Sequence, residues 1–186
     1  SLVYSDPVHK VSIVSRGRAG GYTMTLPSED KHLYSKDYFL DELAKSLGGY
    51  AAEEVMFGAL TTGSSDDIRK ATSIARSMVT RYGMSEKMGT IAYEAGQGRT
   101  LFGAGIESGE ISQEVAAQID AEVKRIIDAA HKKAEGVLKK HRRALGAIAE
   151  KLIEIETIER DDFEKILIAN GITPKKKEDI EHQPLS

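Results

Sequence analysis

The chain has 186 residues, no cysteine, and 26 lysines and arginines against 29 aspartates and glutamates, which gives a formal net charge of −3. The lack of cysteine excludes disulfide frameworks, iron–sulfur clusters and thiol nucleophiles, and the slight acidity argues against a nucleic-acid-binding protein, which needs a basic face. No apolar run approaches the roughly 20 residues of a membrane-spanning helix and no signal peptide opens the sequence, so we expect a soluble chain.

Residues 1–27 alternate in hydropathy with a period of two, which is typical of strands with one buried face. The apolar positions are Val11 and Ile13 in one stretch and Tyr22, Met24 and Leu26 in the next. A glycine-rich connection over residues 15–21 separates the stretches and predicts a bulge or a wide loop. We therefore expect a small antiparallel β-hairpin near the N-terminus.

The stretch Phe39–Val55 has apolar residues at helical spacing and predicts one helix. Ser35 is its candidate N-cap, and Gly58 marks its end. Gly48 and Gly49 lie inside it and lower helix stability by about 1 kcal/mol each relative to alanine. We expect these glycines to permit close packing against a neighbouring element.

The stretch Ile68–Tyr82 predicts a second helix, ending at Gly83 where a left-handed C-terminal cap is expected. Its small apolar residues predict tight helix packing. Residues 84–109 hold six glycines around one short apolar stretch, Thr90–Tyr93, and predict a loop region.

The C-terminal third has three apolar stripes at helical spacing, over Val115–Val137, Leu145–Ile155 and Phe163–Leu167. Two or three helices packed as an antiparallel bundle are the simplest interpretation. The fold class is therefore mainly α, with the N-terminal hairpin as its β-structure. Three segments are predicted: a core of residues 1–110, a C-terminal helical bundle of residues 111–172, and a frayed tail of residues 173–186.

The sequence contains no complete local motif for metal or phosphate binding. Its five histidines are His9, His32, His131, His141 and His182, and none are three to five residues apart, the spacing that would place two on one helical face. Gly103–Gly109 misses the pattern GxGxxG by one position, and neither GxxxxGK[ST] nor GxSxG occurs.

The segment most informative about function is Thr61–Ile68, with the sequence TTGSSDDI. Ser64 and Asp67 have the spacing of a capping box, in which the carboxylate favours the start of a helix. Asp67 is alternatively a metal ligand, but zinc requires about three protein ligands, so Asp67 would need partners from elsewhere. The spacing alone leaves both interpretations open.

Three motifs occur in order along the chain. Asp6–Ala19 contains DPVHKVSI followed by RGRA, Gly48–Gly58 reads GGYAAEEVMFG, and Thr61–Ile68 is followed by Ala71–Ser85. They resemble the first strand, the GGRxAEExxFG helix and the TTGAxNDL segment of FtsH-type membrane-anchored AAA+ zinc metalloproteases, with Tyr50 where arginine is usual. The resemblance runs along nearly the whole chain and is to the peptidase domain of that family.

The resemblance implies that Asp67 is the third zinc ligand, and that the other two ligands and the general base come from a helical HExxH motif. That motif does not occur in the 186 residues. The resemblance therefore implies an N-terminally truncated peptidase core in residues 1–110. The chain as given should be inactive, whereas the parent protein would bind Zn²⁺, together with ATP and Mg²⁺ on a separate ATPase module.

Two further roles follow from the resemblance. Glu53 or Glu54 could be a carboxylate that orients a ligand histidine; the alternative is an exposed acid on a helix. The second strand could be an edge to which an extended substrate adds, or a partner in an ordinary hairpin. Its residues are Tyr22, Thr23, Met24, Thr25 and Leu26.

The leading hypothesis is the proteolytic portion of an ATP-dependent zinc metalloendopeptidase that degrades membrane proteins and misfolded soluble proteins. The resemblance implies self-association as a hexameric ring, unfolded polypeptide substrates and no nucleic-acid partner. It also implies a membrane-anchored parent with this domain on the cytoplasmic side, in a bacterial inner membrane or an organelle. The alternative is a non-catalytic helical assembly module, or pseudoprotease, that oligomerises or binds a protease ring.

Overall fold

The structure, a computed structural model, describes residues 7–15, 20–25, 33–93 and 111–174. Its contacts divide the chain into two units, one of residues 34–135 and one of residues 1–33 with 136–186. The predicted segments 1–110 and 111–172 therefore differ from the units defined by contacts, and most of the predicted tail lies outside the described residues. No helix within the described ranges combines the length and apolarity needed to cross a bilayer.

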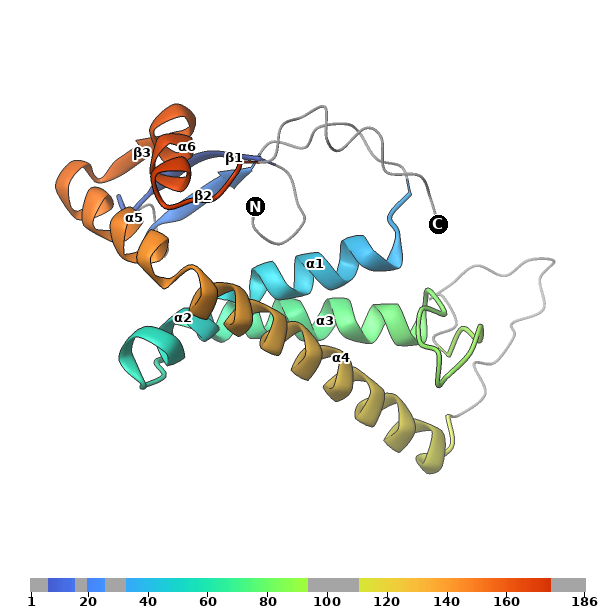
Figure 1. The fold of residues 1–186 in the computed structure, drawn as a ribbon. Coiled ribbons are helices and arrows are strands. Elements are labelled where there is room, and N and C mark those ends of the chain that lie inside the picture. Colours follow the sequence, from blue (N-terminus) through green and yellow to red (C-terminus); the bar gives the residue numbers. More distant parts are fainter. Residues whose placement is uncertain (1–6, 16–19, 26–32, 94–110, 175–186) are drawn as a thin grey trace. The chain divides into compact units, whose positions relative to one another are not determined.

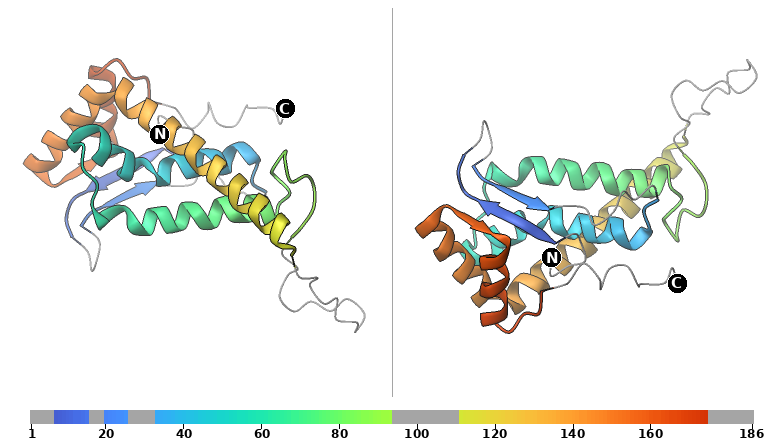
Figure 2. Two further views of the ribbon diagram at one scale, coloured as in Figure 1. Left: turned by 90° about the horizontal axis from the view of Figure 1, so that it is seen from below. Right: turned by 90° about the horizontal axis from the view of Figure 1, so that it is seen from above.

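The unit of residues 34–135 is helical. Its elements are α1 (Lys36–Ser46), α2 (Gly48–Phe57), the short 3₁₀ helix η1 (Thr62–Ser64), α3 (Ser65–Thr80) and α4 (Gln113–Lys140) as far as Glu135. Helices α1 and α3 run alongside one another in all the views (Figures 1 and 2). Ala71 and Ala75 of α3 are fully buried, as is Leu43 of α1, so the predicted tight packing at small residues is confirmed.

Ion pairs link α4 to the helices beside it. Arg76 of α3 lies 2.7 Å from Asp120, and Lys133 of α4 pairs with Asp41, an α1 residue that is only 6% exposed. Burial of an aspartate is favourable only when a partner compensates its charge. Lys133 supplies that partner and thereby helps to fix α4 beside α1.

The single helix predicted over Phe39–Val55 is two helices. Ser35 caps the first as predicted, because its Oγ accepts the N–H of Tyr38 at 3.2 Å. Leu47, with φ −80° and ψ 0°, stays in the right-handed region but ends α1, and α2 begins directly after it. The glycine pair that follows weakens helix continuation at this point. A Cβ built at Gly48 would meet nothing within 4 Å, so close packing does not explain that glycine.

The other unit contains a three-stranded antiparallel sheet with the order β2-β1-β3. Its strands are β1 (Val8–Ser12), β2 (Tyr22–Thr25) and β3 (Thr157–Glu159). The predicted hairpin is confirmed by the pairing of β1 with β2. The third strand was not predicted: Val11 of β1 faces Ile158, which is fully buried, and the hydroxyls of Ser12 and Thr157 lie 2.8 Å apart.

Helices α5 (Arg142–Ile155) and α6 (Arg160–Ala169) pack beside this sheet (Figure 1). With α4, they make three C-terminal helices, which agrees with the two or three predicted from the apolar stripes. Ala144 of α5 shares a buried cluster with Leu167 and Ile172, against which Ile148 and Phe163 pack. The core of this unit therefore lies between α5, α6 and the strands.

Candidate functional site

Asp67 lies in the first turn of α3 and is exposed. Its neighbour Asp66 pairs with Arg69 on the next turn of the same helix. Within the described residues, by contrast, no hydrogen bond or ion pair engages the carboxylate of Asp67. Two adjacent acids thus differ in availability, and Asp67 is the one free to bind a cation.

The predicted capping box between Ser64 and Asp67 does not form. Ser64 has φ −86° and ψ 4°, whereas an N-cap needs an extended backbone, and its side chain makes no capping hydrogen bond. The reason is η1, because this 3₁₀ turn ends at Ser64 and moves the extended capping residue back to Thr61. The Ser64 hydroxyl is buried and has no partner among the described residues.

Glu53 lies on α2 and holds the segment that leads to Asp67. Its Oε2 accepts the Thr61 backbone N–H at 2.7 Å, and its Oε1 accepts the Thr61 hydroxyl at 3.0 Å. The Thr61 hydroxyl in turn accepts the N–H of Gly63 at 3.1 Å. The structure therefore brings together Glu53 and Thr61, the residue before η1, while the orientation of a ligand histidine by Glu53 stays a prediction.

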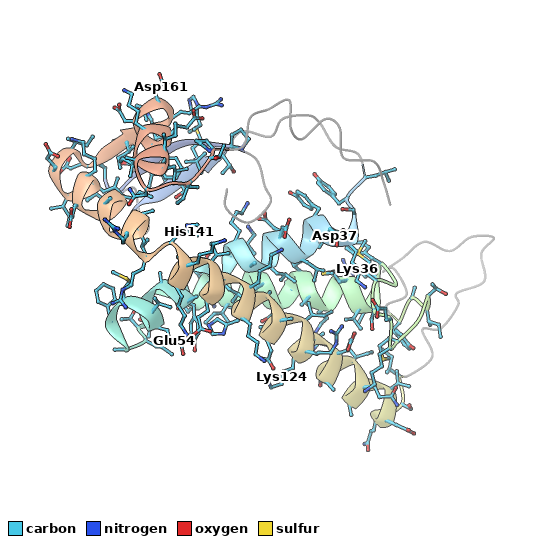
Figure 3. All side chains as sticks on the ribbon, in the orientation of Figure 1. Lys36, Asp37, Glu54, Lys124, His141 and Asp161 are labelled. Carbon is cyan, nitrogen blue, oxygen red and sulfur yellow. The ribbon has the colours of Figure 1, made fainter. Side chains whose placement is uncertain are left out.

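Glu54 points to a different neighbour. Its Oε2 lies 3.1 Å from Nε2 of His131, on α4, and the ring of His131 packs edge-on against Tyr50 with centroids 5.3 Å apart. Figure 3 labels Glu54 on α2. The geometry makes Glu54 part of a contact between α2 and α4, and distinguishes it from Glu53.

The predicted substrate strand is an edge strand of the described sheet. Tyr22, Thr23, Met24 and Thr25 form β2, which pairs only with β1 in the part of the chain that the structure describes. Leu26, the last residue of the predicted strand, lies outside the described residues. An edge strand offers unpaired backbone groups to an added strand, but substrate binding there stays a prediction.

Sequence reasoning missed a buried charge cluster around Glu122 on α4. This residue is 2% exposed, its Oε1 accepts the Ser85 hydroxyl at 2.7 Å, and Arg125 donates to both of its oxygens at 2.8 Å. The hydrogen bonds from Arg125, aided by Ser85, outweigh burial and lower the pKa of Glu122 from 4.5 to about 2. A glutamate on the apolar side of the Val115–Val137 stripe is the signal that could have revealed it.

The donor set at Asp67 does not complete a metal site. Zinc takes about three protein ligands, and no three histidine, aspartate or glutamate side chains come together for a metal among the described residues. The carboxylate of Asp67 fits zinc as one oxygen donor. A zinc site at Asp67 would therefore need further donors from outside the described residues, and the role of Asp67 as a ligand stays a prediction.

Comparisons with known proteins agree on one family. The family model described as Peptidase family M41 matches residues 1–166. The ATP-dependent zinc metalloprotease FtsH 1 of Conexibacter woesei is 45% identical over 167 residues, which are 89% of this chain and 26% of that protein. The FtsH protein of Thermotoga maritima is 46% identical over 164 residues, 87% of this chain and 27% of that protein. The chain thus spans about a quarter of the length of these relatives.

Proposed function

The chain belongs to peptidase family M41, and we propose that it is the proteolytic portion of an ATP-dependent zinc metalloendopeptidase. The observation that carries the proposal is the unpaired carboxylate of Asp67 in the first turn of α3, beside a neighbour whose own charge is compensated. The relatives are named zinc metalloproteases, which supports zinc as the cation.

In this proposal Asp67 contributes one oxygen to the zinc, and a histidine pair elsewhere in the parent protein contributes the rest. When bound, the zinc would supply Lewis-acid activation of water for attack on a peptide carbonyl. The residues of this chain position Asp67 and offer β2 as an edge for an extended polypeptide. Because they include no HExxH, the 186 residues alone are inactive.

The wider assembly belongs to the same proposal. The parent is anchored in a membrane with this portion on the cytoplasmic side, self-associates as a hexameric ring and takes unfolded polypeptides that its ATPase module delivers with ATP and Mg²⁺. The naming of the relatives as ATP-dependent zinc metalloproteases supports the use of ATP, and the small share of their length that the chain matches leaves room for an ATPase module. The membrane anchor and the hexameric ring rest on the family resemblance alone.

The first experiment is the intact mass of the native gene product together with its zinc content. A mass far above 20.3 kDa with bound zinc is expected. A mass near 20.3 kDa without zinc would contradict the proposal and favour a non-catalytic assembly module instead.

The second experiment replaces the ligand. In the native gene product, Asp67→Asn should weaken zinc binding by at least about 100-fold, because it removes a charged donor rather than an outer hydrogen bond, and proteolysis of an unfolded substrate should fall with it. The matched control is Asp66→Asn, which removes the neighbouring charge and its pairing with Arg69. Equal zinc affinity in the two variants would overturn the assignment of Asp67.

A further inference from the structure

Helix α2 meets the segment leading to Asp67 at two points. Glu53 binds Thr61 through two hydrogen bonds of 2.7 and 3.0 Å. A Cβ built on Gly49 would lie 3.7 Å from Oδ2 of Asp67, an ordinary contact distance. Gly49 and Glu53 are four residues apart and so share one face of α2. One helical face therefore borders both ends of Thr61–Asp67.

The hydroxyl of Thr61 joins the two halves of this segment. It donates its proton to Oε1 of Glu53 and accepts the N–H of Gly63 at 3.1 Å, which uses its single donor and one of its two acceptor sites. Gly63 fits closely, because a Cβ there would lie 3.2 Å from the Thr61 hydroxyl oxygen and 3.6 Å from Oε1 of Glu53. We call these three residues, Glu53, Thr61 and Gly63, the Thr61 relay.

Asp67 depends on this arrangement because its own side chain is unpaired among the described residues. No hydrogen bond holds the carboxylate, so the backbone of the first turn of α3 sets its position. That turn follows η1, in which Ser65 N–H bonds the carbonyl of Thr62, and Thr61, with an extended backbone, is the N-cap of η1. The Thr61 relay therefore fixes the point from which α3 starts.

We propose that Thr61 is a positioning residue. Its hydroxyl, bonded to both Glu53 and Gly63, fixes the start of α3 relative to α2, and this places the carboxylate of Asp67 for metal binding. The metal-binding part rests on the proposed function. The relay is a property of this chain by itself and is tested separately.

The test of the relay uses three variants of the chain and amide hydrogen exchange. Thr61→Val keeps the size and branching but removes the hydroxyl, Thr61→Ser keeps the hydroxyl, and Thr62→Val makes the same change at a neighbour whose side chain has no hydrogen bond among the described residues. Thr61→Val should speed exchange at Gly63 about 30-fold, since two hydrogen bonds of about 1 kcal/mol each are lost. Thr61→Ser and Thr62→Val should exchange as the parent chain does. Equal rates in Thr61→Val and Thr62→Val would overturn the relay.

The test of positioning uses the native gene product and the affinity and visible absorption spectrum of Co²⁺ bound in place of zinc. Thr61→Val should weaken Co²⁺ binding by about 10-fold to 100-fold, as for other supporting residues of metal sites, and should alter the spectrum, with Thr61→Ser restoring both. Unchanged affinity and spectrum in Thr61→Val, with Asp67→Asn impaired, would overturn the positioning role alone. Unchanged binding in Asp67→Asn would instead overturn the proposed function and leave the exchange result at Gly63 standing.

Discussion

Glu122 holds a negative charge in an almost fully buried position, and its lowered pKa makes it a contributor to stability. A carboxyl group whose pKa is about 2 in the folded chain and near 4.5 when unfolded stabilises the fold fully above pH 4.5. The contribution disappears as the pH falls from 4.5 towards 2, because the unfolded chain takes up a proton there first. Part of the acid sensitivity of the unit of residues 34–135 therefore arises from one residue.

We predict that Glu122→Gln removes this part of the pH dependence. The parent chain should lose on the order of 2 kcal/mol of unfolding free energy between pH 4.5 and pH 2 that the variant does not lose, and the variant should be less stable at pH 7 because Arg125 loses its partner. Urea unfolding across this pH range measures both effects. Glu114→Gln, at an exposed position of the same helix, is the control, and an identical pH slope in the Glu122 variant would contradict the prediction.

The sequence predicts those features of the candidate site that depend on residues close together in the chain. The motif predicts Asp67 at a helix start, and the structure places it there, unpaired among the described residues, while its role as a zinc ligand stays a prediction. The role of Thr61 was not predictable, because its partner Glu53 belongs to another helix and no periodicity relates the two. The capping interpretation of Ser64 was wrong because a 3₁₀ turn is not distinguishable from a helix start by residue types alone.

The end of α5 is the only place in the described residues where a non-glycine residue has a positive φ. Glu156 has φ +58°, its N–H bonds the carbonyl of Leu152 at 2.8 Å, and its carbonyl accepts the N–H of Ile13 at 2.9 Å. These bonds impose a left-handed conformation that costs a side chain about 1 kcal/mol. The left-handed conformation is needed at this position because Glu156 ends α5 and β3 begins at the next residue.

We predict that Glu156→Gly stabilises the chain by about 0.5–1 kcal/mol. Glycine removes the strain of the left-handed conformation, and its greater conformational entropy in the unfolded chain offsets only part of this stabilisation. Thermal and urea unfolding measure the change. Glu150→Gly is the matched control: it makes the same substitution at an exposed position inside α5 and should destabilise by about 1 kcal/mol. The same sign in both variants would contradict the role of the left-handed conformation.

The elements that the sequence predicted carry local signals, such as Ser35 as an N-cap and the left-handed glycines Gly58 and Gly83. The elements it missed depend on distant partners. Strand β3 has three residues, too few for a period of two to be recognised, and pairs with a strand near the other end of the chain. The break at Leu47 leaves an apolar pattern that continues on both sides, so it is invisible in the spacing.

The sheet joins the two ends of the described chain, since Ser12 and Thr157 are in contact across 145 positions of sequence. Ile158, fully buried opposite Val11, is central to that junction. The unit with both termini is therefore discontinuous in sequence, whereas residues 34–135 form a continuous one. A substitution that disrupts β3 should therefore destabilise β1, which belongs to the same unit, rather than the helices of residues 34–135.

We predict that Ile158→Ala lowers the stability of the discontinuous unit by about 2–5 kcal/mol, the usual cost of truncating a buried isoleucine. Amide exchange should rise in β1 and α6 and stay near parent rates in α3. The control is Ile153→Ala on α5, where the side chain is 78% exposed and little should change. An equal rise in α3 would mean that the chain unfolds as one cooperative body and would contradict the prediction.

The late position of β3 has a consequence for biosynthesis. Strands β1 and β2 leave the ribosome before any other element described here, yet the third strand is translated only after α5. A two-stranded hairpin is marginally stable in water, and an open strand edge invites pairing with other chains. While the contiguous helical residues 34–135 can complete their core during translation, the nascent hairpin must remain unassembled until residue 159 emerges. We therefore expect chaperone binding during synthesis of this part of the protein to concentrate on β1 and β2.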